Sequence, residues 1–154
     1  MFDHIIKLNL LQFILKISDS KYPSSIRSNA VLAISLLTYN EMLFDEIIDK
    51  GVIELIMALC RDQDQDLTVK QFSTLALVHF ALSPKSITIL IERGVLGLFD
   101  TFGSNQSDSN NVVIQTNVSW IFLALCNNGI TGKTMLTQGI TRDMFLVSCN
   151  PDYQ

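Results

Sequence analysis

Apolar and polar residues follow a helical period over most of this chain. Apolar side chains recur every three or four positions in residues 24–39, 66–82 and 110–127, which predicts three long helices. No convincing segment alternates with the two-residue period of a strand. The pattern therefore predicts an all-helical protein.

Start and stop signals bound the first two long helices. Ser24 is able to cap the first helix, and Asp64 or Asp66 can cap the second. The dipeptide Ser83-Pro84 ends the second helix, because proline prevents its continuation.

Shorter helices come in pairs between the long ones. The predicted pairs are 41–50 with 52–60, and 86–93 with 95–101. A glycine, Gly51 or Gly94, stands at each junction, where a residue without Cβ allows a sharp bend. The order of helices is therefore short, short, long. The polar stretch 103–111 has no apolar anchor and is predicted to be a surface loop.

The chain also repeats itself. KGVIELIMALC begins at Lys50, RGVLGLFDTFG at Arg93, and a weaker copy, QGITRDMFLVS, at Gln138. Their glycines are 43 and 45 residues apart, and LNLLQFILKIS from Leu8 is an earlier copy without the glycine. A helical repeat of about 40 to 47 residues is typical of an α-solenoid, whose stacked helices present a long surface and seldom carry chemistry. The expected activity is therefore binding.

The triplet of helices resembles the armadillo repeat. DKGVIELIMALC and ERGVLGLFDTFG are similar to the first half of that motif, and NVSWIFLALC is similar to the second half. The resemblance covers about three and a half repeats of a domain spanning 1–150, and it implies a right-handed α-α superhelix. The repeats are 1–40, 41–83, 84–129 and a partial 130–150, followed by a tail, 151–154. HEAT repeats, the nearest alternative, have two helices and lack this glycine.

The resemblance also implies a binding groove. In armadillo proteins the long third helices line a concave groove, where two positions one turn apart commonly hold Trp and Asn. The Trp position corresponds to Leu32, Leu75 and Trp120. The Asn position corresponds to Leu36, His79 and Ala124. One turn earlier, the same face presents Ser28, Gln71 and Thr116.

Only Trp120 keeps the residue of the family at these positions, which changes the expected partner. The importin-α branch uses the asparagines and tryptophans to bind lysine-rich nuclear-localisation signals, and its cargo binding is disfavoured here. The β-catenin branch uses cations in the groove, and these positions contain none. The remaining surface suits an apolar or amphipathic helical segment of a protein partner.

Two of these residues also have other interpretations. Trp120 can fill the core between repeats, since aromatic residues at helical spacing are often packing residues. His79 can be a hydrogen-bonded groove residue, a pH-sensitive contact or a tolerated polar substitution.

Composition narrows the class further. Of the 154 residues, 48% are hydrophobic and 17% charged, so most helices must be covered on more than one side. The net charge of -4 argues against nucleic acid, and no apolar run has the roughly 18 residues of a membrane span. Cys60, Cys126 and Cys149 are widely spaced and fit reduced, buried residues of an intracellular protein. We expect a cytoplasmic location, with nuclear or cytoskeletal association left open.

Catalytic and ligand motifs are incomplete. NNGITGKT, 127–134, ends like a phosphate-binding loop, but Asn127 stands where glycine is needed and a helix precedes it in place of a strand. The acidic run 61–66 lacks the glycine and final glutamate of a calcium loop. No Cys/His spacing fits a metal site, and no Ser/His/Asp order fits a nucleophile turn. We therefore expect no enzyme, no cofactor and no metal.

The sequence thus predicts a non-enzymatic adaptor that binds a peptide or helical segment along the groove. A structural alternative is a segment of a longer or self-assembling solenoid. It is motivated by the partial fourth repeat, which leaves Met144, Phe145, Leu146 and Val147 without a third helix to cover them. Self-association through that terminal repeat is the expected consequence of the alternative.

Overall fold

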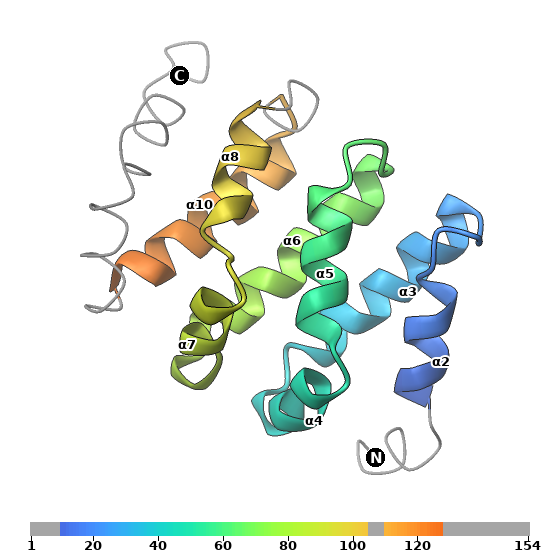
Figure 1. The fold of residues 1–154 in the computed structure, drawn as a ribbon, viewed down its shortest axis with the longest axis horizontal. Coiled ribbons are helices and arrows are strands. Elements are labelled where there is room, and N and C mark those ends of the chain that lie inside the picture. Colours follow the sequence, from blue (N-terminus) through green and yellow to red (C-terminus); the bar gives the residue numbers. More distant parts are fainter. Residues whose placement is uncertain (1–9, 105–109, 128–154) are drawn as a thin grey trace.

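The computed structural model describes residues 10–104 and 110–127, and every element in these two ranges is a helix (Figure 1). This confirms the predicted all-helical class for the described part of the chain. The elements are α2 (Leu10–Ile17), α3 (Ser24–Leu37), η1 (Glu41–Leu43), α4 (Phe44–Asp49), α5 (Val52–Arg61), α6 (Leu67–Leu82), α7 (Pro84–Glu92), α8 (Gly97–Ser104) and α10 (Val112–Asn127).

The three long helices, α3, α6 and α10, fall where the hydrophobic period placed them, with small differences at their ends. Asp66 caps α6, because its Oδ1 accepts a hydrogen bond from Thr68 N at 2.8 Å. The expected cap at Ser24 is wrong: Pro23 occupies the N-cap position of α3 and no side chain caps it. Ser24 is instead the first helical residue.

The short helices differ more from their predicted bounds. α7 begins at Pro84 in place of residue 86, because proline suits the first turn of a helix, where its missing N–H is not needed. α8 runs to Ser104, into the stretch predicted to be a loop. The rest of that stretch, from 105 to 109, and the fourth repeat lie outside the described residues.

Both junction glycines adopt the left-handed backbone that the sharp bend requires. φ is 74° at Gly51, before α5, and 80° at Gly94, between α7 and α8. An added Cβ would meet only Glu54 Oε2 or Arg61 Nη2, each at 3.8 Å, which is ordinary contact. The backbone conformation, and not crowding, is therefore what favours glycine here.

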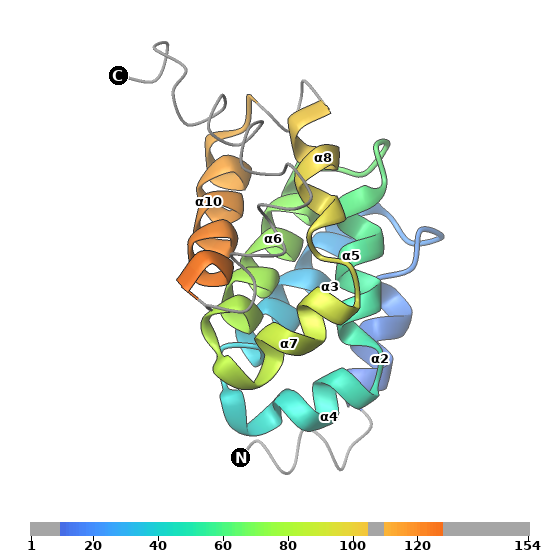
Figure 2. The ribbon, with the colours of Figure 1, turned by 60° about the vertical axis from the view of Figure 1, so that its left-hand side comes forward.

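The helices form two layers. α3, α6 and α10 lie side by side in one layer, with α6 between the other two, while α2, α5 and α8 form the second layer (Figures 1 and 2). α4 and α7 lie at one edge of the two layers (Figure 2). Each repeat therefore contributes one long helix to the first layer and one shorter helix to the second.

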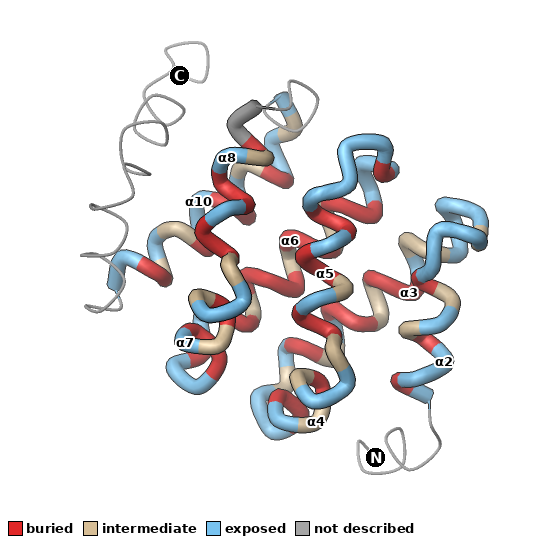
Figure 3. The backbone as a smooth tube through the Cα atoms, in the orientation of Figure 1, coloured by how far each residue is buried: buried red, intermediate tan, exposed pale blue. Residues whose placement is uncertain are grey.

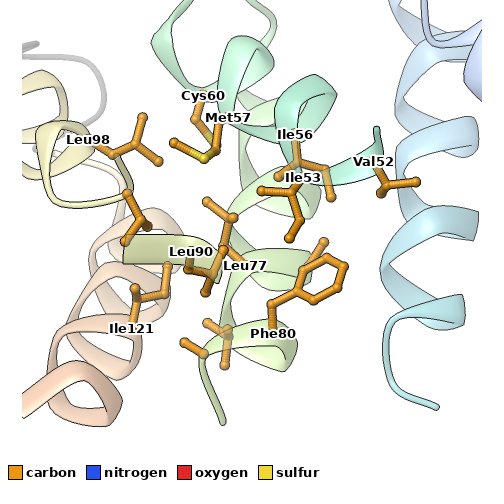
Figure 4. Close-up of a cluster of buried hydrophobic side chains, with 14 of the residues drawn as sticks. Val52, Ile53, Ile56, Met57, Cys60, Leu77, Phe80, Leu90, Leu98 and Ile121 are labelled. Carbon is orange, nitrogen blue, oxygen red and sulfur yellow. The ribbon is translucent and has the colours of Figure 1, made fainter. Parts of the chain in front are cut away.

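The hydrophobic core lies between the layers and extends from α2 to α10 (Figure 3). α5 supplies its centre, where Ile53, Ile56 and Met57 pack toward Leu77 of α6 (Figure 4). This continuous burial joins the repeats into one body.

The cysteines were expected in this core, and the structure separates them. Cys60 is fully buried on α5, as predicted. Cys126 is exposed near the end of α10, so its predicted burial is wrong. Cys149 lies outside the described residues.

Among the described helices, none alone is both long and apolar enough to cross a bilayer. α6 and α7 together reach the length and composition, but the chain bends by 119° between them.

The glycine bend gives a first prediction. Gly94→Ala should destabilise the fold by roughly 1–2 kcal/mol, because alanine has to adopt a left-handed backbone at this position. Gly97→Ala is the matched control: Gly97 begins α8 with nothing within 4 Å of an added Cβ, so alanine should be neutral or stabilising by up to about 1 kcal/mol. Urea unfolding measures both. Equal free energies of unfolding for the two variants would contradict the prediction.

Candidate binding surface

The packing of α6 leaves one stripe of that helix uncovered. Between Val69 and Ala81, all side chains are buried except Gln71, Phe72, Leu75 and His79. Three of these four are spaced by four residues and share one side of the helix. Because α3, α10 and α5 cover the other sides, this stripe points away from the second layer.

The matching positions on α3 and α10 extend the stripe into a surface. All the residues that the sequence placed in the groove are at least partly exposed. We call this set the third-helix face: Ser28, Leu32, Leu36, Gln71, Leu75, His79, Thr116, Trp120 and Ala124. Leu36 and Trp120 are its most exposed large apolar residues, at 63% and 50%. The sequence left open that Trp120 fills the core between repeats. The structure instead places it half-exposed on this face.

His79 occupies the boundary between the first two repeats. Its Nδ1 lies 2.9 Å from the Ser35 carbonyl oxygen and 3.1 Å from Thr38 Oγ1, both at the end of α3. The Tyr39 ring packs edge-on at 5.5 Å between ring centroids. Among the three interpretations of His79, the structure supports a hydrogen-bonded residue, and its bonds are made within the protein.

The Ser35 carbonyl explains why a histidine is useful there. Tyr39 N–H, the donor next in helical register, bonds to Leu36 O, so Ser35 O lacks a backbone donor. The Thr38 hydroxyl donates to Ser35 O at 2.7 Å, and His79 Nδ1 supplies the second hydrogen bond. α6 thus completes the C-terminal end of α3 in the neighbouring repeat.

A second polar bridge joins α6 to α10. Asn117 is buried, and its Nδ2 donates to Gln71 O at 3.2 Å and to Thr74 Oγ1 at 2.9 Å. Gln71 Nε2 in turn donates to Asn111 Oδ1 at 3.2 Å, and that oxygen also accepts from Ile114 N in the first turn of α10. The Gln71 side chain is therefore partly committed to holding the next repeat.

The two remaining polar residues of the third-helix face bond to their own helices. Ser28 Oγ donates to Ser25 O at 3.1 Å, and Thr116 Oγ1 donates to Val112 O at 2.8 Å. The groups used inside the protein are thus the hydroxyl hydrogens of Ser28 and Thr116, Nδ1 of His79, and one of the two amide hydrogens of Gln71. What the face offers outward is mainly the apolar surface of its leucines and Trp120.

The face is also without acidic side chains. α3, α6 and α10 contain no Asp or Glu, and their cations are Arg27, which is partly buried, and Lys70, which is fully buried. Every carboxylate in the described residues belongs to α4, α5, α7, α8, η1 or a connecting turn. The carboxylates of the described residues therefore lie away from this face.

The exposed ion pair in the second layer connects repeats as well. Arg93, at the end of α7, pairs with Glu54 of α5. Arg61 Nη2 donates to Gly94 O at 3.3 Å beside it. Exposed pairs of this kind contribute little stability each. They orient the two turns that carry the left-handed glycines.

Within residues 10–104 and 110–127, no three His, Cys, Asp or Glu side chains gather in a way that could hold a metal ion. The residues of the motif at 128–134 lie outside the described part, and the segment before it is the helix α10, as the sequence predicted.

No family model matches this chain, and no curated protein or solved structure is significantly similar to it. The two layers of helices are observed, whereas membership of the armadillo family and the right-handed superhelix stay predictions.

The sequence predicted which residues form the face, but it did not indicate the side chains that hydrogen-bond one long helix to the next. Asn117, Thr74, Ser35 and Thr38 were not singled out, although they make the bridges between repeats. Their signal is weak, because a small polar residue in an apolar helix can be exposed to solvent or can bond to a neighbouring helix. Only the register between the helices distinguishes these two positions.

The position of His79 gives a prediction about acid stability. Partial burial lowers the pKa of His79 below its ordinary value, and the bond to Ser35 O opposes that shift. Because the folded pKa is depressed, the unfolded state binds the proton first, so stability is complete above pH of about 6.5 and falls as the pH drops toward the folded pKa. Urea unfolding from pH 7.5 to 5 should show this loss.

The matched variant is His79→Gln, whose amide can still donate to Ser35 O but does not titrate. Its free energy of unfolding should fall less steeply over the same pH range. The slope that remains belongs to the other titrating groups. If the wild type and His79→Gln have identical slopes, His79 does not have the depressed pKa.

Proposed function

We propose that this chain is a non-enzymatic, armadillo-like adaptor that binds a segment of another protein along the third-helix face. Three observations support the proposal: the third helices lie side by side, the predicted contact residues are all accessible, and the polar side chains among them are bonded internally. The single observation that carries it is the exposed apolar surface of Leu36 and Trp120 on this face. In the proposal, the face is the concave side of a right-handed superhelix.

The chemistry of the face limits the type of partner. Burying apolar surface contributes about 25 cal/mol per Å², and large residues such as Trp dominate the binding energy of interfaces. A lysine-rich peptide would meet no carboxylate on α3, α6 or α10. We therefore propose an apolar or amphipathic partner segment, and not the basic cargo bound by the importin-α branch.

The proposal predicts that the face and not the second layer captures partners. Leu36→Gln with Trp120→Gln removes apolar area without adding charge, and both side chains are exposed, so the double variant should fold. Retention of specific proteins from a cell lysate should fall about tenfold or more, in line with loss of two central contacts. Quantitative mass spectrometry of the captured proteins measures this, with circular dichroism as the folding check.

Phe13→Gln is the control, since Phe13 is 57% exposed on α2 in the other layer. It should retain the proteins that the wild type captures. If the folded double variant retains them equally well, the third-helix face is not the binding surface.

A second candidate is a scaffold that continues through further repeats or further copies. Leu123 of α10 is 47% exposed, whereas Val78, its counterpart on α6, is buried in the row of third helices. The side of α10 away from α6 thus presents an apolar residue where a next repeat would pack. A sedimentation coefficient that rises with concentration, and no longer does so in Leu123→Gln, would support self-assembly; a constant coefficient would oppose it.

A further inference from the structure

The hydrogen bonds of His79 fix which of its ring nitrogens carries the proton. Ser35 O is a carbonyl oxygen and only accepts, so Nδ1, at 2.9 Å, has to be the protonated nitrogen. The Thr38 hydroxyl already donates to Ser35 O, which leaves Thr38 Oγ1 free to accept from Nδ1 as well. In the neutral ring, Nε2 is then a bare acceptor.

This acceptor is available on the third-helix face. Both hydrogen bonds of His79 involve Nδ1, and Nε2 has no partner in the described part of the chain. Nε2 is also not among the polar atoms that are buried without a partner, and His79 is a partly exposed residue, so this nitrogen is not fully buried. Leu75 lies one turn before His79, and Leu36 is its counterpart on α3. The acceptor therefore has Leu75 one turn away and the ring of exposed Tyr39 beside it.

A partner that covers this nitrogen has to satisfy it. An acceptor buried without a donor loses its water and gains nothing in return, which would offset much of the gain from the leucines around it. The partner must therefore bring a hydrogen-bond donor to this point.

The donor is best supplied by a helix with an apolar side. An extended peptide would bring a whole row of backbone N–H and C=O groups. The hydroxyl hydrogens of Ser28 and Thr116 and one amide hydrogen of Gln71 are already used within the protein. A helix satisfies its own backbone and needs a partner only for single side chains. Its donor must then be a side chain.

Charge further restricts that side chain. The charged groups of the three third helices are Arg27 and Lys70, both cationic, and no carboxylate accompanies them. A lysine or arginine of the partner would lose water here without gaining a counter-charge. A neutral donor, the N–H of Trp, Asn or Gln or the hydroxyl of Ser, Thr or Tyr, avoids this cost.

We propose that the third-helix face recognises an apolar helical segment that donates one neutral side-chain hydrogen bond to Nε2 of His79. This inference rests on the proposed function and names the chemistry of the partner. His79 then has two roles: Nδ1 joins α6 to α3, and Nε2 selects the bound segment.

A phage-displayed library of random 16-residue peptides, panned against the full chain at pH 7.5, tests the proposal. The strongest binder is synthesised and its affinity measured for the wild type, His79→Leu, and Thr38→Val. His79→Leu removes the acceptor, and Thr38→Val alters the bridge at Nδ1 while leaving Nε2 in place. Long-range proton–nitrogen NMR reads the tautomer of His79 directly.

The proposal expects selected peptides with apolar residues at helical spacing and a neutral donor among them. His79→Leu should bind about two- to tenfold more weakly, the worth of one neutral hydrogen bond, and Thr38→Val should bind like the wild type. Replacing the peptide's donor by an isosteric apolar residue should weaken wild-type binding similarly but leave His79→Leu unaffected.

Other outcomes overturn it. If Leu36→Gln with Trp120→Gln abolishes binding but His79→Leu does not weaken it, this inference fails and the proposed function stands. Selected peptides dominated by Lys and Arg, or an Nε2-protonated ring in the free protein, also overturn the inference. If His79→Leu does not fold, the NMR measurement of the His79 tautomer and the replacement of the peptide's donor still test the inference on the wild-type protein. If the best peptide binds the double variant undiminished, or no peptide is enriched, the proposed function fails as well.

Discussion

The structure depends on the burial of α6 between its two neighbours. α6 contacts α3 on one side, α10 on the other and α5 beneath, so a single free stripe is left along it. A helix that is apolar nearly all round is stable in water only when it is covered in this way. Among the described helices, the same coverage that packs the repeats together leaves this stripe as the side of α6 that is open to a partner.

Polar side chains in this layer serve the stacking of the helices. His79 completes the end of α3, and Asn117 anchors α10 to the Gln71 carbonyl, so each boundary within the row has a buried or half-buried hydrogen bond. Such bonds contribute modest net stability, but they are costly to leave unmade, and they therefore specify one register between helices. The consequence for function is that the face keeps little polar capacity of its own. Its outward chemistry is mainly that of its leucines and Trp120, with one imidazole nitrogen of His79 and the remaining amide atoms of Gln71.

The pattern of burial and exposure also determines where the charged side chains lie. In residues 10–104 and 110–127, the carboxylates lie on the second layer, the short edge helices and the turns, where water solvates them and where Asp66 caps α6. The third helices lack them because two of their sides face neighbouring helices, and charged groups are rarely buried there without a partner. An apolar face and an acidic remainder are thus two results of the same packing.

Much of this architecture could be predicted from local signals. The 3.6-residue period located α3, α6 and α10, and the repeated glycine marked bends that the positive φ of Gly51 and Gly94 confirms. The resemblance to the armadillo repeat selected positions on one side of each long helix, and the structure shows that these side chains are at least partly exposed. Ends were less certain: the serine at residue 24 looked like a cap, but Pro23 holds that position, since both residues are compatible with a first turn.

What could not be predicted are contacts that link residues more than 40 positions apart. The bond from His79 to Ser35 depends on the register of α6 against α3, and the exposure of Cys126 depends on what packs beyond α10. Neither is encoded in a local pattern. Whether a polar residue in such a helix binds a partner or a neighbouring repeat is decided by this register alone.

Trp120 offers the most direct test of the central claim, because it is the single tryptophan of the chain and lies half-exposed on the third-helix face. In the free protein its fluorescence should be quenched by acrylamide and iodide. Titration with a selected peptide that lacks tryptophan should shift the emission of Trp120 to shorter wavelength and reduce its quenching by both agents. A peptide that binds with full occupancy while the emission and quenching of Trp120 stay unchanged would contradict the account.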